Sequence, residues 1–334
     1  MDRTPTVSVI IPNYNHAPYL RARIDSVLNQ TFQDFEIIML DDHSADASPE
    51  VMAEYKDNPH VSHIVINPEN SGNTFLQWER GMQLARGEYI WIAESDDVAE
   101  PQFLATLIGE LQKNPQATVA YSHSVMIDSD GQPMSMTWHR KGSSGKVNTF
   151  DGTYYVRKKQ LVHNHIYNAS MVVFRRSAIE KVPCDYQQYT YCGDWLFWTY
   201  IAMQGQVIEV CRPLNRYRQH SDKVSNIASH DGRNWSNMAG VLSTMASMLH
   251  LTPLQCRCLR GKCTKHFRKH ERYVRSMLKD NRTASHSEAG GNDEDAVLQT
   301  LDAIRRQYSS LYGGTFFDMR LYEIGKLFGF LSKD

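Results

Sequence analysis

Between residues 7 and 121, short apolar segments alternate with amphipathic ones, and this alternation constrains the fold more than any other feature of the sequence. Val7–Ile11 is a run of mostly β-branched residues, which predicts a strand buried on both faces and stopped by Pro12. Tyr19–Leu28 follows, with apolar residues spaced as on one face of a helix. Repeated strand–helix units of this kind predict an α/β fold, with a largely parallel sheet and helices on both of its sides.

The same criteria predict the remaining elements. Further strands are expected at Phe35–Leu40, Val61–Ile66, Tyr89–Ala93 and Thr118–Tyr121, and helices at Ser48–Tyr55, Thr74–Ala85 and Pro101–Lys113. Beyond Ser122 we expect a glycine-rich loop at Gly142–Gly152, strands at Ser170–Phe174, Val207–Val210 and Asn215–Arg218, and a helix at Asp194–Met203. The expected domains are 1–225, with halves 1–122 and 123–225, and a helical region at 235–334 with a flexible loop near 280–295.

Several classes of protein are disfavoured by the bulk properties of the chain. The formal net charge of −1 argues against a protein that binds polyanions over its whole surface, and no nucleic acid partner is expected. No run approaches 18 apolar residues, so no transmembrane helix is expected, and the first residues lack the order of a signal peptide. Six scattered cysteines indicate reduced thiols. The expected setting is cytoplasmic.

Acidic residues follow two of the predicted strands directly. Asp41 and Asp42 end one, and Asp96 and Asp97 follow another. In parallel sheets, ligands bind at the carboxyl ends of the strands. Adjacent carboxylates repel one another, and a divalent cation such as Mg²⁺ or Mn²⁺ would relieve that repulsion while also binding substrate phosphates. The alternative for Asp96-Asp97 is a solvated turn ahead of the next helix.

At these positions the sequence resembles the family 2 inverting glycosyltransferases, which have the GT-A fold. The resemblance covers residues 7 to about 220, in matching order and spacing. It rests on Ser8-Val9-Ile10-Ile11-Pro12-Asn13-Tyr14-Asn15, Asn29-Gln30-Thr31-Phe32, Phe35-Glu36-Ile37, Asp41-Asp42-His43-Ser44, Asn70-Ser71-Gly72-Asn73, Ala85-Arg86-Gly87-Glu88-Tyr89-Ile90, Glu94-Ser95-Asp96-Asp97 and Gly193-Asp194-Trp195-Leu196-Phe197. It implies an enzyme that moves a sugar from a nucleotide-sugar, with UDP as the favoured nucleotide, onto an acceptor hydroxyl.

The resemblance also implies roles for single residues. Positions that hold the nucleotide are matched by Pro12, Tyr14, Asp42, Asn70, Gly72 and, near the ribose, Asp96. Asp97 matches the ligand of a Mn²⁺ or Mg²⁺ ion at the donor diphosphate, and Asp194 matches the catalytic base. His220 lies where relatives place a polar residue near the diphosphate, so it is a candidate second metal ligand, or else an ordinary residue at a strand end.

Two departures from the family pattern affect this assignment. Glu94 stands where the family often has the first aspartate of Asp-X-Asp-Asp, which is a mild change. Phe75-Leu76-Gln77-Trp78 stands where many members carry Ala-Arg-Asn, so the group replacing that arginine near the donor is not identified by the sequence.

The expected mechanism follows from the charges. A cation at the diphosphate stabilises the leaving group, so a single base on the opposite face of the sugar suffices, and the attack inverts the anomeric centre. Asp194 has the alternative of a helix N-cap. Trp195 and Trp198 are candidate platforms for an acceptor sugar, or else core residues.

The carboxy-terminal third carries a strongly basic segment. Arg257–Arg282 contains ten Lys or Arg residues against Glu271 and Asp280. An anionic membrane surface would fit such a segment, and relatives that act on lipid-linked glycans make peripheral contact with the inner face of the membrane a hypothesis. The alternative is a solvated helical face offset by the acidic run at Glu288–Asp295. Phe316–Leu331 has the apolar spacing of a helix docked on the core.

Other functions find less support. Cys256, Cys258, Cys263, His266 and His270 have poor spacing for zinc on a predicted helix. Neither Gly-x-Gly-x-x-Gly nor a P-loop follows the first strand, which disfavours a nicotinamide-dependent oxidoreductase. The remaining alternative is a noncatalytic module with the same fold that binds nucleotide-sugars or glycans. Asp194 distinguishes the two, because such a module needs no base and shows no turnover.

Overall fold

The computed structural model describes residues 4–135, 145–161, 163–220, 233–284 and 291–327, with only the backbone described at 233, 277–284, 291–295 and 326–327. The chain forms two compact units that share helix α6. The first unit comprises Met1–Tyr155, His165–Thr190 and Phe197–His220, and the second comprises Val156–Asn164, Tyr191–Leu196 and Ser221–Asp334. The boundaries expected near residue 225 fall outside the described residues and stay a prediction.

The first unit is built on a nine-stranded mixed sheet with the order β3-β2-β1-β4-β8-β6-β9-β5, in which β7 also pairs with β9. Its strands are β1 (Val7–Asn13), β2 (Phe35–Asp41), β3 (Val61–Ile66), β4 (Tyr89–Ile92), β5 (Val98–Ala99), β6 (Ala117–Ile127), β7 (Val147–Asp151), β8 (Val172–Arg175) and β9 (Gln206–Arg218). The strands β1 to β4 are parallel, β6 and β9 are parallel to each other, and β8 joins the two groups through antiparallel pairs. The mainly parallel GT-A type sheet predicted from the alternation is confirmed.

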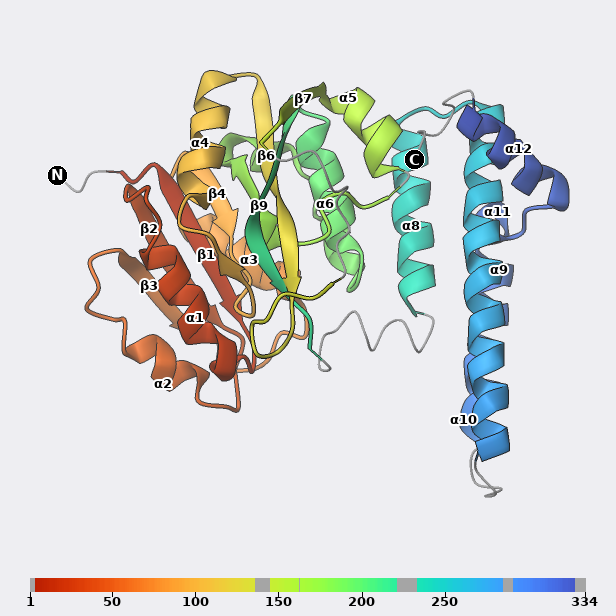
Figure 1. Cartoon of the computed structure of the whole chain (residues 1–334), viewed down its shortest axis with the longest axis horizontal. Helices are drawn as coiled ribbons and strands as arrows, with labels where there is room; N and C mark the ends of the chain where they lie inside the picture. Colours follow the sequence, from red (N-terminus) through yellow and green to blue (C-terminus); the bar gives the residue numbers. More distant parts are fainter. Residues whose placement is uncertain (1–3, 136–144, 162, 221–232, 285–290, 328–334) are drawn as a thin grey trace. The chain divides into compact units, whose positions relative to one another are not determined.

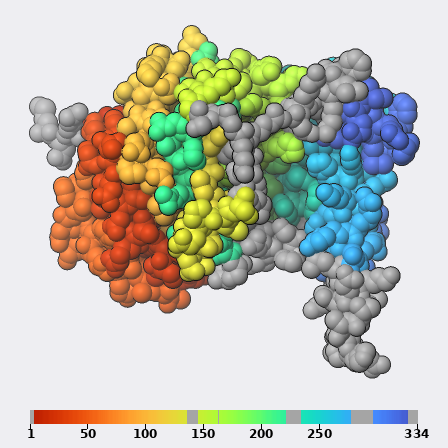
Figure 2. Space-filling model, viewed as in Figure 1, coloured from red at the N-terminus to blue at the C-terminus, as the bar shows by residue number. Residues whose placement is uncertain are grey.

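Helices flank this sheet, as Figure 1 shows for α1 in front of the amino-terminal strands. They are α1 (Ala17–Leu28), α2 (Ser48–Ala53), α3 (Thr74–Leu84), α4 (Phe103–Lys113), α5 (Gly152–Tyr155) and α6 (Gly193–Ala202). In the space-filling view, the amino-terminal segments form one continuous packed surface (Figure 2). Every residue of β1, β2 and β4 is buried, whereas β3 at the sheet edge is only partly so. Burial of those strands on both faces explains their near-continuous apolar sequences.

Some sequence-based boundaries are wrong. The strand β1 continues through Pro12 to Asn13. Its pairing with β4 ends at Ile10, so the N–H group that proline lacks is not required for a hydrogen bond to β4. The two strands expected near the end of the domain are one strand, β9, which runs through Pro213 with register shifts against β6. Residues 147–151 of the expected glycine-rich loop form β7, whereas residues 142–144 of that loop lie outside the described residues.

A buried polar network locks β1, β2 and the start of β4 together. Ser8 donates to Glu36 Oε1 at 2.7 Å, and the guanidinium of Arg86 holds Glu36 Oε2 at 2.8 Å. Gly87 donates its N–H to Ser8 Oγ, and a Cβ on Gly87 would lie 2.6 Å from the backbone nitrogen of Ser8. The motif Ala85-Arg86-Gly87 therefore has a structural role, because only glycine allows this close approach.

The second unit is helical. It contains α8 (Arg233–Met248), α9 (Pro253–Ala284), α10 (Gly291–Gln307), α11 (Ser309–Tyr312) and α12 (Phe316–Leu327). Trp235, Phe267 and Tyr312 form its aromatic centre, with the rings of Phe267 and Tyr312 stacked at 4.8 Å. The predicted helical carboxy-terminal region is confirmed. Of the loop expected near 280–295, residues 280–284 belong to α9 and residues 291–295 to α10, so those parts of the expectation are wrong. Residues 285–290, and residues 328–331 of the last expected helix, lie outside the described residues.

Candidate active site

The carboxyl ends of β1, β2 and β4 meet at one edge of the sheet and bring the predicted acidic residues to it. Asp41 organises the loop after β2: it accepts hydrogen bonds from Asn13 Nδ2 at 2.8 Å and from the backbone N–H of Ser44 at 2.8 Å. These contacts fix the loop that follows β2 and carries Asp42, the residue matched to the nucleotide site.

Asp42 is buried inside a ring of donors. Its Oδ1 accepts from Asn67 Nδ2 at 2.7 Å and Gln77 Nε2 at 2.8 Å, and its Oδ2 accepts from Ser71 Oγ at 2.8 Å. Gln77 comes from the segment that departs from the family pattern, and its amide orients the Asp42 carboxylate. The segment that departs from the family pattern therefore supplies an uncharged hydrogen-bond donor to the Asp42 carboxylate.

The other residues predicted to bind the nucleotide differ in their exposure to solvent. The Tyr14 side chain is 48% exposed, so its ring is free to stack on a base, whereas Pro12 is buried within β1. Gly72 has φ of +66°, a conformation that favours glycine, and its N–H is bonded to Asn70 Oδ1. This turn positions Ser71, which binds Asp42.

Asp96 forms a candidate metal group with two histidines. One ligand atom from each of His16, Asp96 and His220 lies within 4.8 Å of the others, and His220 Nε2 is 3.3 Å from Asp96 Oδ2. His16 Nδ1 lies 2.8 Å from Ser95 Oγ, a contact that fixes the orientation of the ring. Imidazole and carboxylate are suitable donors for a divalent first-row cation such as Mn²⁺, so the residues fit the metal that was expected.

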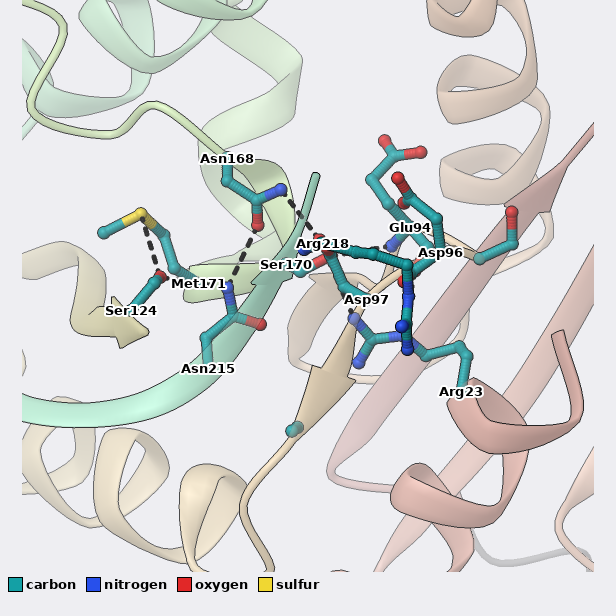
Figure 3. Close-up of polar contacts among 12 residues, drawn as sticks. Arg23, Glu94, Asp96, Asp97, Ser124, Asn168, Ser170, Met171, Asn215 and Arg218 are labelled. Carbon is teal, nitrogen blue, oxygen red and sulfur yellow. Dashed lines mark hydrogen bonds and ion pairs between the residues drawn. The ribbon is translucent and has the colours of Figure 1, made fainter. Parts of the chain in front are cut away.

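Asp97 is placed differently from its neighbour. Its carboxylate is fully buried, with Oδ1 accepting from the backbone N–H of Arg218 at 2.9 Å and Oδ2 accepting from Asn168 Nδ2 at 2.7 Å. The guanidinium of Arg23 lies 3.9 Å away (Figure 3). These contacts engage both carboxylate oxygens of Asp97 within the protein, whereas the carboxylate of Asp96 lies beside the two histidines.

Burial shifts the protonation of the groups behind this edge. Removal from water, together with the charge of Asp96, raises the pKa of Glu94 to about 8, although Trp78 Nε1 donates to it at 2.9 Å. Removal from water also lowers the pKa of Arg23 to about 10, against the attraction of Asp97. Burial and the neighbouring charge of Asp96 therefore disfavour the ionised form of Glu94.

Arg218 acts as a clamp within the protein. Its Nε donates to the backbone oxygen of Asp96 at 2.7 Å, and its Nη1 donates to the backbone oxygens of Asp128 and Ser129. The guanidinium also lies over the ring of Tyr19 at 4.7 Å. Because the side chain is buried and engaged in these contacts, Arg218 positions Asp96.

In the second unit, Asp194 lies in the first turn of α6, which begins at Gly193. Removal from water raises the pKa of Asp194 to about 6, against hydrogen bonds from the backbone of Trp195 and from Asn164, whose Nδ2 is 3.4 Å from Asp194 Oδ2. A residue inside the first turn is not the cap expected in the alternative interpretation. A pKa near the working pH is what general-base catalysis requires.

Comparison with known proteins identifies the family. Residues 8–183, more than half of the chain, match the family described as glycosyl transferase family 2. The chain belongs to glycosyltransferase family 2. A relative described as an uncharacterized glycosyltransferase of Haemophilus influenzae is 25% identical to this enzyme over 232 residues, which are 69% of this chain and 71% of that protein. The poly(ribitol-phosphate) β-N-acetylglucosaminyltransferase TarP of Staphylococcus aureus is 29% identical over 181 residues, 52% of this chain and 50% of TarP.

Solved structures share the fold of this glycosyltransferase. S. aureus TarS 1–349 in complex with UDP-GlcNAc aligns with a TM-score of 0.58 and 15% identity, over 97% of this chain and 92% of that one. The mannosyltransferase PcManGT of Pyrobaculum calidifontis, in complex with GDP-Man and Mn²⁺, aligns with a TM-score of 0.51 and 16% identity, over 98% and 88% of the two chains. The enzyme therefore has the fold of nucleotide-sugar-dependent glycosyltransferases.

The two candidate acceptor residues of the enzyme are mostly enclosed. Trp198 is fully buried against Trp78, Phe174 and Phe197, so it is a core residue and offers no face to a sugar. Trp195 is 7% exposed, and its Nε1 donates to the backbone oxygen of Gln160 at 2.8 Å. Trp195 alone stays a candidate for contact with an acceptor.

The basic segment of the glycosyltransferase lies on α9, and α12 carries some of its partners. Asp318 accepts from Arg257 Nε at 2.9 Å and lies 3.3 Å from Arg260, while Glu323 pairs with Lys265. The acidic run expected to offset the segment has no described side chains. Of the helices in the described ranges, none is long and apolar enough to cross a membrane.

Two residues of the candidate site are missing from the sequence-based assignment. His16 follows β1 within Asn13-Tyr14-Asn15-His16. Because β1 ends at the same edge of the sheet as the strand before Asp96, the sequence position of His16 could have predicted that the two residues lie close together. Asn168, which holds Asp97, lies in a segment without periodicity, and no pattern in the sequence points to it. Both contacts join residues more than 70 positions apart, so only the folded chain reveals them.

Proposed function

We propose that this glycosyltransferase is an inverting enzyme that transfers a sugar from a UDP-sugar to an acceptor hydroxyl, with Mn²⁺ or Mg²⁺ at the donor diphosphate and Asp194 as the base. We further propose that its acceptor is a glycan or lipid-linked glycan of bacterial surface polysaccharide assembly. TarP, whose name specifies transfer of N-acetylglucosamine to poly(ribitol-phosphate), and the TarS complexes with UDP and UDP-GlcNAc support this choice.

The proposal rests above all on the convergence of His16, Asp96 and His220 at the carboxyl edge of the sheet. These three residues would hold the divalent cation, which supplies Lewis-acid stabilisation of the diphosphate leaving group when it is bound. Asp97 would keep Asp96 in place through Arg218, whose backbone N–H donates to the Asp97 carboxylate and whose Nε donates to the backbone oxygen of Asp96.

Recognition of the base is assigned to Asp42 and Tyr14. A carboxylate can accept the N–H of a pyrimidine, and the exposed ring of Tyr14 can stack on it. Gln77, Ser71 and Asn67 hold Asp42 in one orientation, which reduces the entropy lost when the nucleotide binds.

Asp194 is assigned the removal of the acceptor proton. As the acceptor oxygen bonds to the anomeric carbon, the bond from that carbon to the diphosphate oxygen breaks and the configuration inverts. The acceptor O–H proton passes to the Asp194 carboxylate, whose raised pKa of about 6 makes it a stronger base than an ordinary aspartate. A base of this kind contributes about 10²–10⁴ in rate.

A panel of donors tests the assignment. Thermal stabilisation and turnover are measured with UDP-, GDP- and dTDP-sugars, each with Mn²⁺, Mg²⁺ or EDTA, for the wild type, Asp96→Asn, Asp97→Asn and Asp194→Asn. We expect metal-dependent stabilisation by UDP-sugars, lost in Asp96→Asn while its melting temperature without metal is retained. Asp97→Asn should lower that metal-free melting temperature, because it disturbs buried contacts, and Asp194→Asn should bind donor without transferring it.

Other outcomes would redirect the assignment. A GDP- or dTDP-sugar as the only stabilising donor would contradict UDP, and retention of the metal response in Asp96→Asn with its loss in Asp97→Asn would restore the roles implied by the resemblance. Donor binding without turnover on any acceptor would favour the noncatalytic module.

We also propose that α9 makes peripheral contact with an anionic membrane on its cytoplasmic side, near a lipid-linked acceptor. The motivating observation is the concentration of Lys and Arg between residues 257 and 282. Among those whose side chains the structure describes, Arg257, Arg260 and Lys265 form ion pairs with α12. Cosedimentation with anionic vesicles at low salt should be lost at high salt and in a Lys269→Glu/Arg272→Glu variant. A protein that stays wholly in the supernatant would contradict the contact.

A further inference from the structure

A second cluster of metal-binding side chains lies on the strands β6 and β9 of the first unit. One ligand atom from each of His123, Glu209 and Cys211 lies within 4.8 Å of the others. His123 Nε2 is 3.5 Å from Glu209 Oε1, and the three residues are only 8%, 7% and 4% exposed. The cluster shares no residue with the group formed by His16, Asp96 and His220, and the mechanism above does not use it.

The register of the strands produces this convergence. Glu209 and Cys211 are two residues apart on β9, so their side chains point to the same face of the sheet. On the adjacent strand, Ser122 pairs with Val210 but His123 pairs with Pro213, so β9 has extra residues at this step. The irregularity brings Cys211 beside His123, and such bulges commonly re-aim side chains at functional sites.

A neighbouring amide orients two of the three ligands. Asn148 on β7 is paired with Glu209, and its Nδ2 donates to Glu209 Oε2 at 3.0 Å and to Cys211 Sγ at 3.4 Å. The Oε1 atom of Glu209 lies 3.5 Å from His123 Nε2, and the Cys211 sulfur accepts a hydrogen bond from the same amide. Hydrogen bonds of this kind to ligating groups are the usual outer layer of a metal site.

The donor set selects the metal. A histidine–carboxylate ion pair would explain two of the three residues but gives no reason for a sulfur atom to converge on them. Tetrahedral zinc bonds of about 2.0–2.3 Å place neighbouring ligand atoms roughly 3.3–3.8 Å apart, and the His123–Glu209 separation already falls in that range. Mg²⁺ and Ca²⁺ prefer all-oxygen sites, whereas zinc accepts sulfur, nitrogen and oxygen together.

We propose that His123, Glu209 and Cys211 bind a zinc ion that is separate from the cation of the donor site. The ion joins β6 to β9 at the point where their register changes, and water or another group completes its coordination. Binding releases the thiol proton of Cys211, and the cation balances the negative charge of the buried Glu209 carboxylate.

Cobalt substitution tests the proposal directly. The full chain is stripped with a chelator and titrated with Co²⁺, and the thiolate-to-cobalt charge-transfer absorption is followed in the near ultraviolet. The wild type should reach one equivalent with this band, and added Zn²⁺ should abolish it by displacement. Absence of the band in the folded wild type would overturn the proposal, whatever the variants do.

Variants separate this site from the donor site and from the other thiols. Asp96→Asn should keep the band, as should Cys263→Ser, a matched buried cysteine on α9 that lies in neither metal group of the described residues. Cys211→Ser should lose it. Asn148→Ala keeps all three ligands and should bind Co²⁺ about 10–100-fold more weakly. A band that survives in Cys211→Ser, or that disappears in Asp96→Asn, would place the metal elsewhere.

Discussion

Replacing Asp194 by asparagine should have opposite effects on stability and on catalysis. The carboxyl is nearly isosteric with the amide, so the fold is expected to survive the change. Removal from water raises the pKa of Asp194 from 3.8 to about 6. This rise corresponds to at most about 3 kcal/mol of unfavourable free energy for the charged form in the folded state.

The sign of the pH dependence follows from proton binding. Between pH 4 and pH 6 the folded protein retains a proton that the unfolded chain releases, so this group makes the wild type less stable as the pH rises. Asparagine does not titrate. The free energy of unfolding of Asp194→Asn relative to wild type should therefore be near zero at pH 4 and increase by up to about 3 kcal/mol by pH 7.

Urea unfolding of both proteins at pH 4, 5, 6 and 7 measures this difference. Asp302→Asn, which removes a half-exposed carboxylate beside Arg305 in the same unit, is the control for loss of a carboxylate alone. Turnover of Asp194→Asn should be reduced about 10²–10⁴-fold, and kcat/KM of the wild type should rise with pH through a midpoint near 6. A stability difference that stays constant from pH 4 to pH 7 would refute the argument that Asp194 is held away from water.

Three further predictions concern other parts of the enzyme. Gly87→Ala should lower the free energy of unfolding by about 1–3 kcal/mol in a denaturation series, because the added Cβ would lie 2.6 Å from the backbone of Ser8; an unchanged midpoint would contradict the close approach. Asp318→Asn should destabilise the helical unit by about 1.5–3 kcal/mol at pH 7. Burial raises the pKa of Asp318, but hydrogen bonds from Thr315 and Arg257 outweigh it and hold the pKa well below its usual range, so this loss should shrink as the pH falls below about 4, and a loss that persists there would argue against it. Gln77→Ala should raise the Kd of a UDP-sugar in calorimetry by about tenfold, through loss of one hydrogen bond to Asp42, whereas Gln83→Ala on the same helix should leave it unchanged.

The sequence predicted the local elements well where one physical cause dominated. Strands β1, β2 and β4 are buried on both faces, so their apolar runs marked them without knowledge of their neighbours. The sequence did not predict the strands β5 and β7, because both are held mainly by pairing with β9. The alternating exposure of Val147–Asp151 is typical of many polar segments. The continuation of β1 past Pro12 depended on where β4 ends, which is a property of the neighbouring strand.

The acidic residues of the candidate site were also predictable, because they occur in short motifs that directly follow predicted strands. The pairs Asp41-Asp42 and Asp96-Asp97 stood out in this way, whereas His220 was assigned through the family resemblance, and the structure brings Asp96 and His220 together. A short motif does not distinguish the roles of two adjacent aspartates such as Asp96 and Asp97. Only the folded chain decides that Asn168 and the backbone of Arg218 enclose Asp97.

The sequence by itself therefore determined the α/β class, the edge of the sheet at which the site forms and the kinds of side chain gathered there. The tertiary structure alone decided that His16 joins Asp96, that Trp198 is core, and that His123, Glu209 and Cys211 converge at a register shift. The physical reason is that periodicity and turn chemistry act over a few residues. Ligand sets and buried hydrogen bonds depend on the register between strands that are distant in the chain, and that register is set when the sheet packs.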